Sequence, residues 1–294
     1  MFQRELRPDE RAVLLERGWQ QQRVAEFSRR GNVWWFVDPV TTSSYIVKAV
    51  EKGDRELSIL PWLLNQPTLS SVILPAEIIE CKNSSLIVTP GLSSVARIVH
   101  ALGDRRLVER TVDAFLRLVE CVEIFHQNNI AHMDIDLENF VFADTDICCG
   151  PHTFKKDSFY LIDFGATRRF DSGPGTNIVI DDFREAGGHY PPPEGMDAVE
   201  PFAYDIFSLG KALITWWDIV QCFREDVDLP RSAVDAFIQE RLLCRDPLQR
   251  ARIEDVKREW LHLAHLAKTA PRISPPPPVP AAADGSISEH VVVS

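Results

Sequence analysis

The chain has 294 residues and a mass of 33.3 kDa, enough for one large domain or two ordinary ones. Its formal net charge is −11, so we expect no nucleic-acid partner, because binding to phosphates relies on Lys and Arg. The N-terminus is charged and is not expected to be a secretory signal, and no apolar run approaches the roughly 20 residues that cross a bilayer. We expect an intracellular protein, cytoplasmic or nuclear, with no membrane partner.

The cysteines support this expectation. No two of them form a CxxC pair or a spacing typical of metal ligands, so we expect reduced thiols and no zinc or redox site. Cys148 and Cys149 are adjacent and are predicted to be surface thiols in a loop. The six cysteines are Cys81, Cys121, Cys148, Cys149, Cys222 and Cys244.

The first third of the chain is predicted to be rich in strands. Short runs of Val, Phe, Trp and Tyr are separated by turn residues, and one helix-like segment covers residues 55–64. The aromatic cluster at residues 34–36 is interpreted as core packing rather than as a ligand site. The predicted strands are residues 21–27, 33–38, 44–50, 71–74 and 86–88.

After residue 94 the apolar residues recur at helical spacing, over residues 112–126, 205–220 and 232–243. Strands followed by helices predict an α+β fold with a boundary near Thr89–Gly91. We expect a helical extension over residues 1–18, a main domain over 19–268 that divides at 89/90, and a disordered proline-rich tail over 269–294.

The segment AHMDIDLENF, residues 131–140, contains the residues most suited to chemistry. Phosphoryl transfer needs a carboxylate that deprotonates the acceptor hydroxyl and oxygen ligands for magnesium. Asp134 and Asn139 lie five positions apart in a predicted loop and meet these two needs. A predicted strand over residues 159–162 then leads to Asp163, a second candidate magnesium ligand, and to Gly165, which is expected to allow an unusual backbone turn.

These motifs resemble those of the eukaryotic-type protein kinase family. His132 to Asn139 resembles the loop H-R-D-L-x-x-x-N, and residues 163–165 match D-F-G. The other matches follow in the family's order, which makes a chance match very unlikely. Residues 45–48 resemble V-A-I-K, residues 192–194 resemble A-P-E, residues 205–210 resemble D-x-W-S-x-G, and residues 246–250 resemble D-P-x-x-R.

The resemblance implies a two-lobed protein-kinase-like fold, with a small β-rich N-lobe over residues 19–89 and a larger helical C-lobe over 90–268. It also implies ATP and Mg²⁺ as cofactors and a protein hydroxyl, on Ser or Thr, as the acceptor. The resemblance implies three chemical roles: Asp134 is the catalytic base, Lys48 contacts the α- and β-phosphates and pairs with Glu56, and Asn139 and Asp163 hold the metal. It also implies structural roles: Glu194 and Arg250 form an ion pair, Asp205 supports the loop, and His132 is structural.

Four departures from the family pattern bear on activity. Residues 24–32 contain one glycine where the family's phosphate-covering loop has three, and Arg29 or Arg30 is considered as a substitute. Met133 replaces an Arg that couples the loop to a phosphorylated segment. Residues 143–158 form an insertion, predicted to be an enlarged surface loop.

The fourth departure is Asp136, which stands where Ser/Thr kinases have a Lys near the transferred phosphate. A unit charge pair at 4 Å is worth about 4 kcal/mol at an effective dielectric constant near 20, or about a thousandfold in rate if fully felt. We therefore expect weakened activity, which Asp136→Lys should raise.

Three functions stay open. The chain is read as an active protein kinase, with a pseudokinase that binds nucleotide or acts as a scaffold as the alternative. A small-molecule phosphotransferase is the third reading, and the motifs around Glu194, Asp205 and Arg250 argue against it because they support a peptide-binding lobe. The sequence does not indicate the substrate, the pathway, the preference for Ser/Thr over Tyr, or the oligomeric state.

Overall fold

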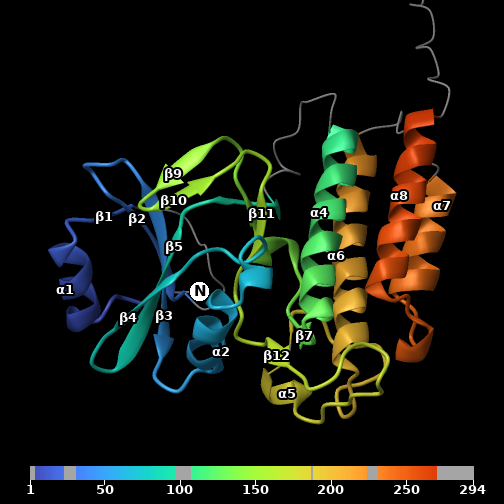
Figure 1. Cartoon of the computed structure of the whole chain (residues 1–294), viewed down its shortest axis with the longest axis horizontal. Helices are drawn as coiled ribbons and strands as arrows, with labels where there is room; N and C mark the ends of the chain where they lie inside the picture. The colour runs from blue at the N-terminus through green and yellow to red at the C-terminus, as the bar shows by residue number, and fades with distance from the viewer. Residues whose placement is uncertain (1–3, 23–30, 97–106, 187, 224–230, 270–294) are drawn as a thin grey trace, which may run out of the picture.

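The computed structural model describes residues 4–22, 31–96, 107–186, 188–223 and 231–269. In these residues an antiparallel sheet with short helices lies beside a helix-rich part (Figure 1). The expected mixture of strands first and helices later is confirmed. The predictions for the glycine-poor segment at residues 23–30 and for the tail beyond residue 269 lie outside the described residues.

The strand-rich part is built around a five-stranded antiparallel sheet with the strand order β1-β2-β3-β5-β4. Its central strand β3 places Lys48 opposite Val33 of β2 and Ile87 of β5. Lys48 therefore lies in the middle of the sheet rather than at an edge. The strands are β1 Gln20–Gln21, β2 Val33–Val37, β3 Ser44–Glu51, β4 Glu77–Glu80 and β5 Ser84–Pro90.

The structure corrects one predicted strand and adds another. Residues 71–74 follow a 3-10 helix, η1 Pro67–Leu69, and make only a single bridge, Ile73 to Leu161. Ile73 and Leu74 are buried as a short core-filling segment, and such a run cannot be told from a strand by composition. The sequence analysis missed β4, whose outer residues Glu77 and Glu80 are exposed.

Two helices cover opposite faces of the sheet. Leu14 of α1 (Pro8–Glu16) packs in one cluster with Trp34 and Phe36, so the expected packing role of these aromatic residues is confirmed. Helix α2 (Arg55–Leu64) forms where it was predicted and joins a second cluster on the other face. Because only three residues lie between β3 and α2, Glu56 of α2 is brought back toward Lys48.

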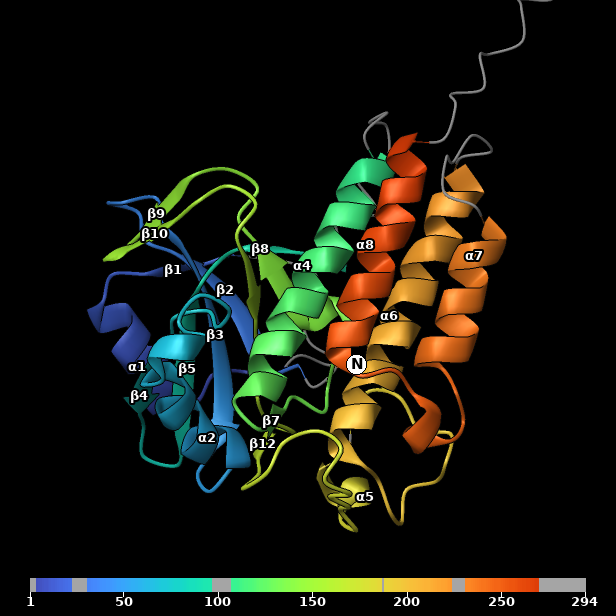
Figure 2. The same ribbon diagram turned by 45° about the vertical axis from the view of Figure 1, so that its right-hand side comes forward.

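The helix-rich part is a bundle of long helices that run side by side (Figures 1 and 2). Its core contains Phe115, Phe125, Trp216 and Trp260, each at most 1% exposed. The three predicted helices are found, although the last one divides into an α-helix and a π-helical turn. The helices are α4 Leu107–Gln127, α6 Pro201–Phe223, α7 Arg231–Ala236 followed by η3 Phe237–Leu242, and α8 Ile253–Thr269.

Short strands and turns connect the two parts and surround the loop at residues 132–139. These are β6 Ser93–Ser94, β7 Ile130–Ala131, η2 Leu137–Asn139, β8 Phe140–Phe142, β11 Phe159–Leu161, β12 Arg168–Arg169, α5 Phe183–Ala186 and η4 Pro247–Gln249. Strand β8 lies between β6 and β11, while β7 pairs with β12.

The insertion at residues 143–158 is a β-hairpin rather than the predicted surface loop. Its strands are β9 Ile147–Cys149 and β10 His152–Phe154, paired antiparallel. Phe154 is 2% exposed and Cys149 is 3% exposed, because both side chains fill a cluster with Leu74 and Val141. The prediction of two surface thiols was therefore wrong for Cys149, whereas Cys148 is exposed.

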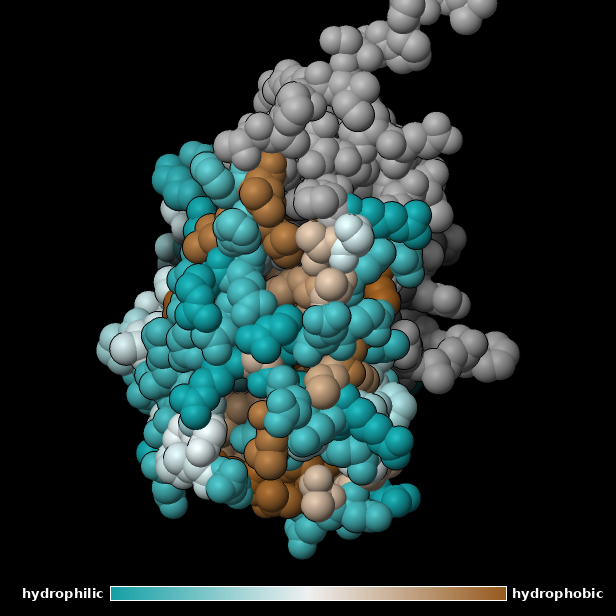
Figure 3. Space-filling view, turned by 90° about the vertical axis from the view of Figure 1, so that its right-hand side faces the viewer, coloured by the Kyte–Doolittle hydropathy of each residue, from teal (hydrophilic) through white to brown (hydrophobic). Residues whose placement is uncertain are grey.

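Figure 3 shows the face of the molecule on the right-hand side of Figure 1, where hydrophobic side chains are scattered among hydrophilic ones. Leu261 and Leu266 are the large hydrophobic residues of α8 that are exposed. No helix in the described ranges is both long enough and apolar enough to cross a membrane. Within those ranges, Cys81, Cys121, Cys148, Cys149 and Cys244 are free thiols.

Candidate active site

The loop between β7 and β8 brings Asp134 and Asn139 together as predicted. The Asn139 side-chain nitrogen donates to the backbone oxygen of Asp134 at 2.8 Å and to its carboxylate Oδ2 at 3.0 Å. Asp136 caps the 3-10 turn η2, which ends at Asn139, by accepting from the Glu138 N–H at 2.9 Å. The loop is thus closed on itself by hydrogen bonds from its own side chains.

Asp205 of α6 supports the loop from the interior, in the supporting position that its motif implied. Its carboxylate is fully buried and accepts from the backbone N–H of His132 at 2.8 Å and of Met133 at 2.7 Å. The ring nitrogen of His126 lies 3.1 Å from the same carboxylate. Met133 has φ +63°, a strained conformation for a residue with a side chain, and these two hydrogen bonds hold it there.

A second group of charges forms around Lys48. The Lys48 ammonium donates to Glu56 Oε2 at 2.6 Å and to Asp163 Oδ1 at 2.8 Å. Glu56 also accepts from the backbone N–H of Phe164 at 3.2 Å. The predicted pairing of Lys48 with Glu56 is present, so strand β3, helix α2 and the segment after β11 meet at one ammonium group.

In this group two carboxylates share the Lys48 ammonium. Burial disfavours the charged form of Lys48, but the charges of Asp163 and Glu56 outweigh it and raise the Lys48 pKa above its usual value. Burial raises the pKa of Glu56, and the negative charge of Asp163 adds to this effect against the attraction of Lys48. Asp163 is the exposed member of the group, with 43% of its side chain accessible.

Hydrogen bonds connect the two groups. The Ile162 N–H donates to the Asn139 backbone oxygen at 3.1 Å, and a ring nitrogen of His132 lies 3.1 Å from the Ile162 backbone oxygen. The ring of His132 also packs at 5.5 Å from that of Phe164, which agrees with the structural role expected of this histidine. Asp163 is therefore positioned next to the loop that contains Asp134.

The expected unusual turn is at Asp163 rather than at Gly165. Asp163 has φ +62°, whereas Gly165 is not among the described glycines with positive φ. Strained backbone at a non-glycine residue costs about 1–3 kcal/mol and persists where the surroundings hold it. Here the strain lies at a candidate ligand, and the Lys48 ion pair and the Phe164 N–H bond to Glu56 hold the segment on both sides.

Asp134 has the surroundings of a base. Burial raises the pKa of its carboxyl above the usual value, and the nearby Asp163 charge adds to the rise. Hydrogen bonds from His189 N and Asn139 partly oppose it. The bond from the His189 N–H, at 2.7 Å to Asp134 Oδ1, was not expected from the sequence, because 55 residues separate the two positions and no motif links them.

Asn139 and Asp163 fit a magnesium ion that is shared with phosphates. The Asn139 nitrogen is engaged with Asp134, so its side-chain oxygen is the atom that can bind a cation. Among the described residues no cluster of three or more His, Cys, Asp or Glu side chains could hold a metal by itself. Two protein ligands with the remainder from water and phosphate is the usual way in which Mg²⁺ is bound at nucleotide sites.

The implied structural ion pair is also present. Arg250 is 6% exposed and donates through both terminal nitrogens to Glu194, at 3.0 Å for one of the two bonds. Arg250 also donates to the backbone oxygens of Cys244 and Ala203. This bidentate pair ties the segment before α6 to the turn before α8.

A further anchor was missed by the sequence analysis. Asp182 accepts two hydrogen bonds from Arg168, at 2.6 and 2.8 Å, and lies 3.7 Å from Arg55 at the start of α2. The Arg168 hydrogen bonds lower the pKa of Asp182, so its charge is retained. A fixed carboxylate thus links α2 to the segment after Asp163.

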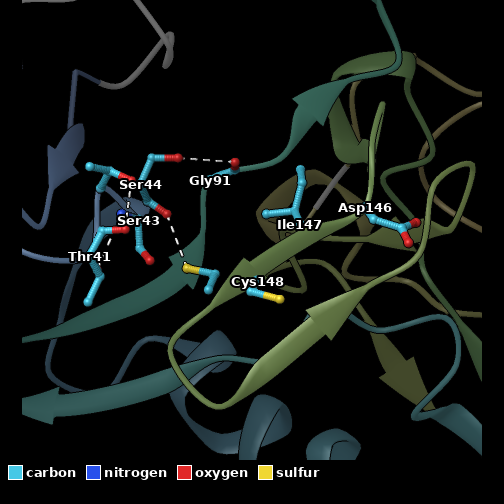
Figure 4. A pocket seen from close by; sticks show the side chains of 9 residues that line it. Thr41, Ser43, Ser44, Gly91, Asp146, Ile147 and Cys148 are labelled. Atoms are coloured by element: carbon cyan, nitrogen blue, oxygen red, sulfur yellow. Dashed lines mark hydrogen bonds between the residues drawn. The ribbon is translucent and has the colours of Figure 1, made fainter.

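A cavity of about 310 Å³ lies apart from these groups, between the β2–β3 turn and the inserted hairpin (Figure 4). Thr41, Ser43 and Ser44 line one side, while Asp146 and Cys148 line the other. The Cys149 thiol donates to the Ser44 backbone oxygen at 3.4 Å and joins the two sides. None of the predicted site residues lines this cavity.

Comparison with known protein families found no family model that matches the chain, and a search of curated proteins found no match.

Proposed function

We propose that the chain adopts the two-lobed protein kinase fold, divides into the domains expected from the sequence, and transfers the γ-phosphate of ATP to a hydroxyl of a protein substrate. The observation that supports this most is the Lys48 ammonium held between Glu56 and Asp163, next to the Asp134–Asn139 pair. A phosphate-binding cation, a metal-binding carboxylate and a base are the parts that phosphoryl transfer requires.

Each residue then has a chemical task. Lys48 is oriented by Glu56 and binds phosphate oxygens, and Asn139 Oδ1 with Asp163 holds the metal. When bound, Mg²⁺ would neutralise part of the negative charge of the phosphates. Asp134 accepts the proton of the acceptor hydroxyl, and its raised pKa increases its affinity for that proton. The His189 N–H and the Asn139 amide donate to the two Asp134 oxygens and fix the direction in which the carboxylate faces.

A pseudokinase that binds nucleotide is the second candidate, and one observation favours it. The segment that contains His189 lies directly on Asp134, at the place where an acceptor hydroxyl would approach. A carboxylate oxygen has two lone pairs. One hydrogen bond on each Asp134 oxygen therefore leaves a lone pair for the hydroxyl of the substrate. The His189 contact therefore does not block the base, and the enzyme stays the first candidate. The Arg250–Glu194 pair and the Asp205 support argue against a small-molecule phosphotransferase.

The test is transfer of radiolabel from [γ-³²P]ATP to generic protein substrates with Mg²⁺. The matched variants are Asp134→Asn, which removes the base, and Asp144→Asn, which changes an exposed aspartate shortly after β8. We expect transfer by the wild-type protein and by Asp144→Asn, with a loss of about a hundredfold or more in Asp134→Asn. Nucleotide binding without any transfer that depends on Asp134 would favour the pseudokinase.

A further inference from the structure

The carboxylate of Asp136 has hydrogen-bond partners on both oxygens. Oδ1 accepts from the Glu138 N–H at 2.9 Å, and Oδ2 accepts from the Tyr190 hydroxyl at 2.5 Å. A ring nitrogen of His189 lies 3.9 Å from Oδ2. Asp136 is only 8% exposed. Its charge is therefore directed at the 188–190 segment and not simply at the open site.

Segment 188–190 is held against the loop at each of its residues. At Gly188 a Cβ would lie 2.1 Å from the Met133 backbone oxygen, so only glycine allows this approach. The His189 N–H donates to Asp134 Oδ1 at 2.7 Å. The backbone oxygen of Tyr190 accepts from the Tyr204 hydroxyl at 2.7 Å, and the Tyr190 hydroxyl donates to Asp136.

We propose that Asp136 and Tyr190 are positioning residues for the reaction of Asp134, an inference that rests on the proposed function. Asp136 holds the Tyr190 hydroxyl by a charge-assisted hydrogen bond. Tyr190 in turn holds the adjacent His189 N–H on the base. The pair fixes the orientation of Asp134 toward the acceptor, and neither residue contacts the reacting atoms.

This inference reverses the expectation from the sequence. If the charge of Asp136 mainly repelled the transferred phosphate, neutralising it would raise turnover. If Asp136 holds segment 188–190, neutralising it releases Tyr190 and lowers turnover, and Tyr190→Phe has the same consequence although it changes no charge. The two accounts therefore predict opposite signs for Asp136→Asn and different outcomes for Tyr190→Phe.

The experiment is a double-mutant cycle with Asp136→Asn, Tyr190→Phe and the double variant, with Tyr160→Phe as control. Tyr160 packs its ring against Phe154 in the hairpin cluster, away from segment 188–190. We expect both single variants to lower kcat by about tenfold, as the loss of one charge-assisted hydrogen bond implies, and to leave the KM for ATP within about twofold. The double variant should be no slower than the slower single variant.

Amide hydrogen exchange gives a readout that does not need activity. Exchange of the His189 amide, followed in peptides that cover residues 188–200, should accelerate by about tenfold in both single variants and not in Tyr160→Phe. Faster exchange in the two variants, together with no phosphate transfer by the wild-type protein, would support the contact and contradict the proposed function. Unchanged exchange, a higher kcat in Asp136→Asn, or independent and additive effects of the two changes would overturn the inference.

Discussion

Each of the two helices that cover the sheet contains a buried glutamate. The pKa of one is shifted below its ordinary value and the pKa of the other is shifted above it. Glu10 of α1 is fully buried, and burial alone would raise its pKa, but hydrogen bonds from Arg4, Ser84 and the Arg7 N–H lower it to about 2. Glu56 of α2 is 3% exposed, and its pKa is raised. Both side chains are buried, yet their pKa values are shifted in opposite directions.

The two carboxylates differ in the donors around them, and the charge of Asp163 further raises the pKa of Glu56. Glu10 accepts two hydrogen bonds from Arg4, at 2.6 and 2.8 Å, one from Ser84 at 2.5 Å and one from the Arg7 N–H at 2.8 Å. Glu56 has the Phe164 N–H and a lysine that it shares with Asp163. The protein thus supplies four hydrogen bonds to Glu10, whereas Glu56 shares its lysine with Asp163, the residue that the proposed function assigns to the metal.

The largest effect is expected from a change at Lys48, whose ammonium contacts both Glu56 and Asp163. Lys48→Met should lower phosphoryl transfer by about a hundred- to a thousandfold, because it removes the cation that binds phosphate. Steady-state transfer from radiolabelled ATP measures this. Lys52→Met, which removes an exposed lysine in the turn after β3, is the control and should keep full activity. A Lys48→Met protein that retained more than a tenth of the wild-type rate would refute the assignment of Lys48.

The hydrogen-bonded group around Glu10 should matter for the stability of the protein and not for phosphoryl transfer. Glu10→Gln should lower the free energy of unfolding by about 2–3 kcal/mol at pH 7, because it weakens a buried ion pair and leaves Arg4 without a charged partner. Urea titration measures this against Glu5→Gln, an exposed control.

The pH dependence of that difference gives an independent check. The folded-state pKa of Glu10 is about 2, below its ordinary value of 4.5, so its stabilising contribution is present above pH 4.5 and is lost as the pH falls toward 2. The gap in unfolding free energy between wild type and Glu10→Gln should therefore shrink between pH 6 and pH 3. A gap that stays constant over this interval would mean that Glu10 is not held as an anion by its neighbours.

A smaller effect on stability is expected at Glu56. Its raised pKa means that the folded protein disfavours this charge, so Glu56→Gln should cost less unfolding free energy than Glu10→Gln. Transfer should still fall, because Lys48 loses the partner that orients it. The same urea titrations measure both glutamates, and a cost for Glu56→Gln equal to that of Glu10→Gln would contradict the comparison.

The smallest effect concerns the proline-rich tail. A chain that ends at Thr269, the last residue of α8, should melt within a few degrees of the full-length protein, because the composition of the tail cannot form a core. Differential scanning calorimetry of both chains measures this. A loss of more than about 10 °C would mean that the tail contributes to the stability of the body.

Short motifs predicted the parts of the site that depend on local spacing. Asp134 and Asn139 meet because both lie in one loop, and Glu56 reaches Lys48 because a single turn separates β3 from α2. The position of Asp163 next to them followed from the strand that precedes it. The first two contacts are local and were predicted, whereas the Lys48–Asp163 contact spans 115 residues and was not.

Contacts between distant segments could not be predicted in the same way. The His189 N–H on Asp134 and the Tyr190 hydroxyl on Asp136 depend on a backbone path of more than 50 residues. The burial of Cys149 depends on a hairpin whose strands are only three residues long, too short to show an alternating pattern. The charge of Asp136 was visible in the sequence, but its hydrogen-bond partner was not.

The most direct test of the proposed metal–nucleotide site is the stabilisation of the protein by ATP with and without Mg²⁺. Ligand that binds only the folded protein raises the melting temperature, so ATP with Mg²⁺ should raise it more than ATP alone. In Asp163→Asn the additional rise due to Mg²⁺ should be lost. The absence of any shift with millimolar ATP and either Mg²⁺ or Mn²⁺ would contradict the account.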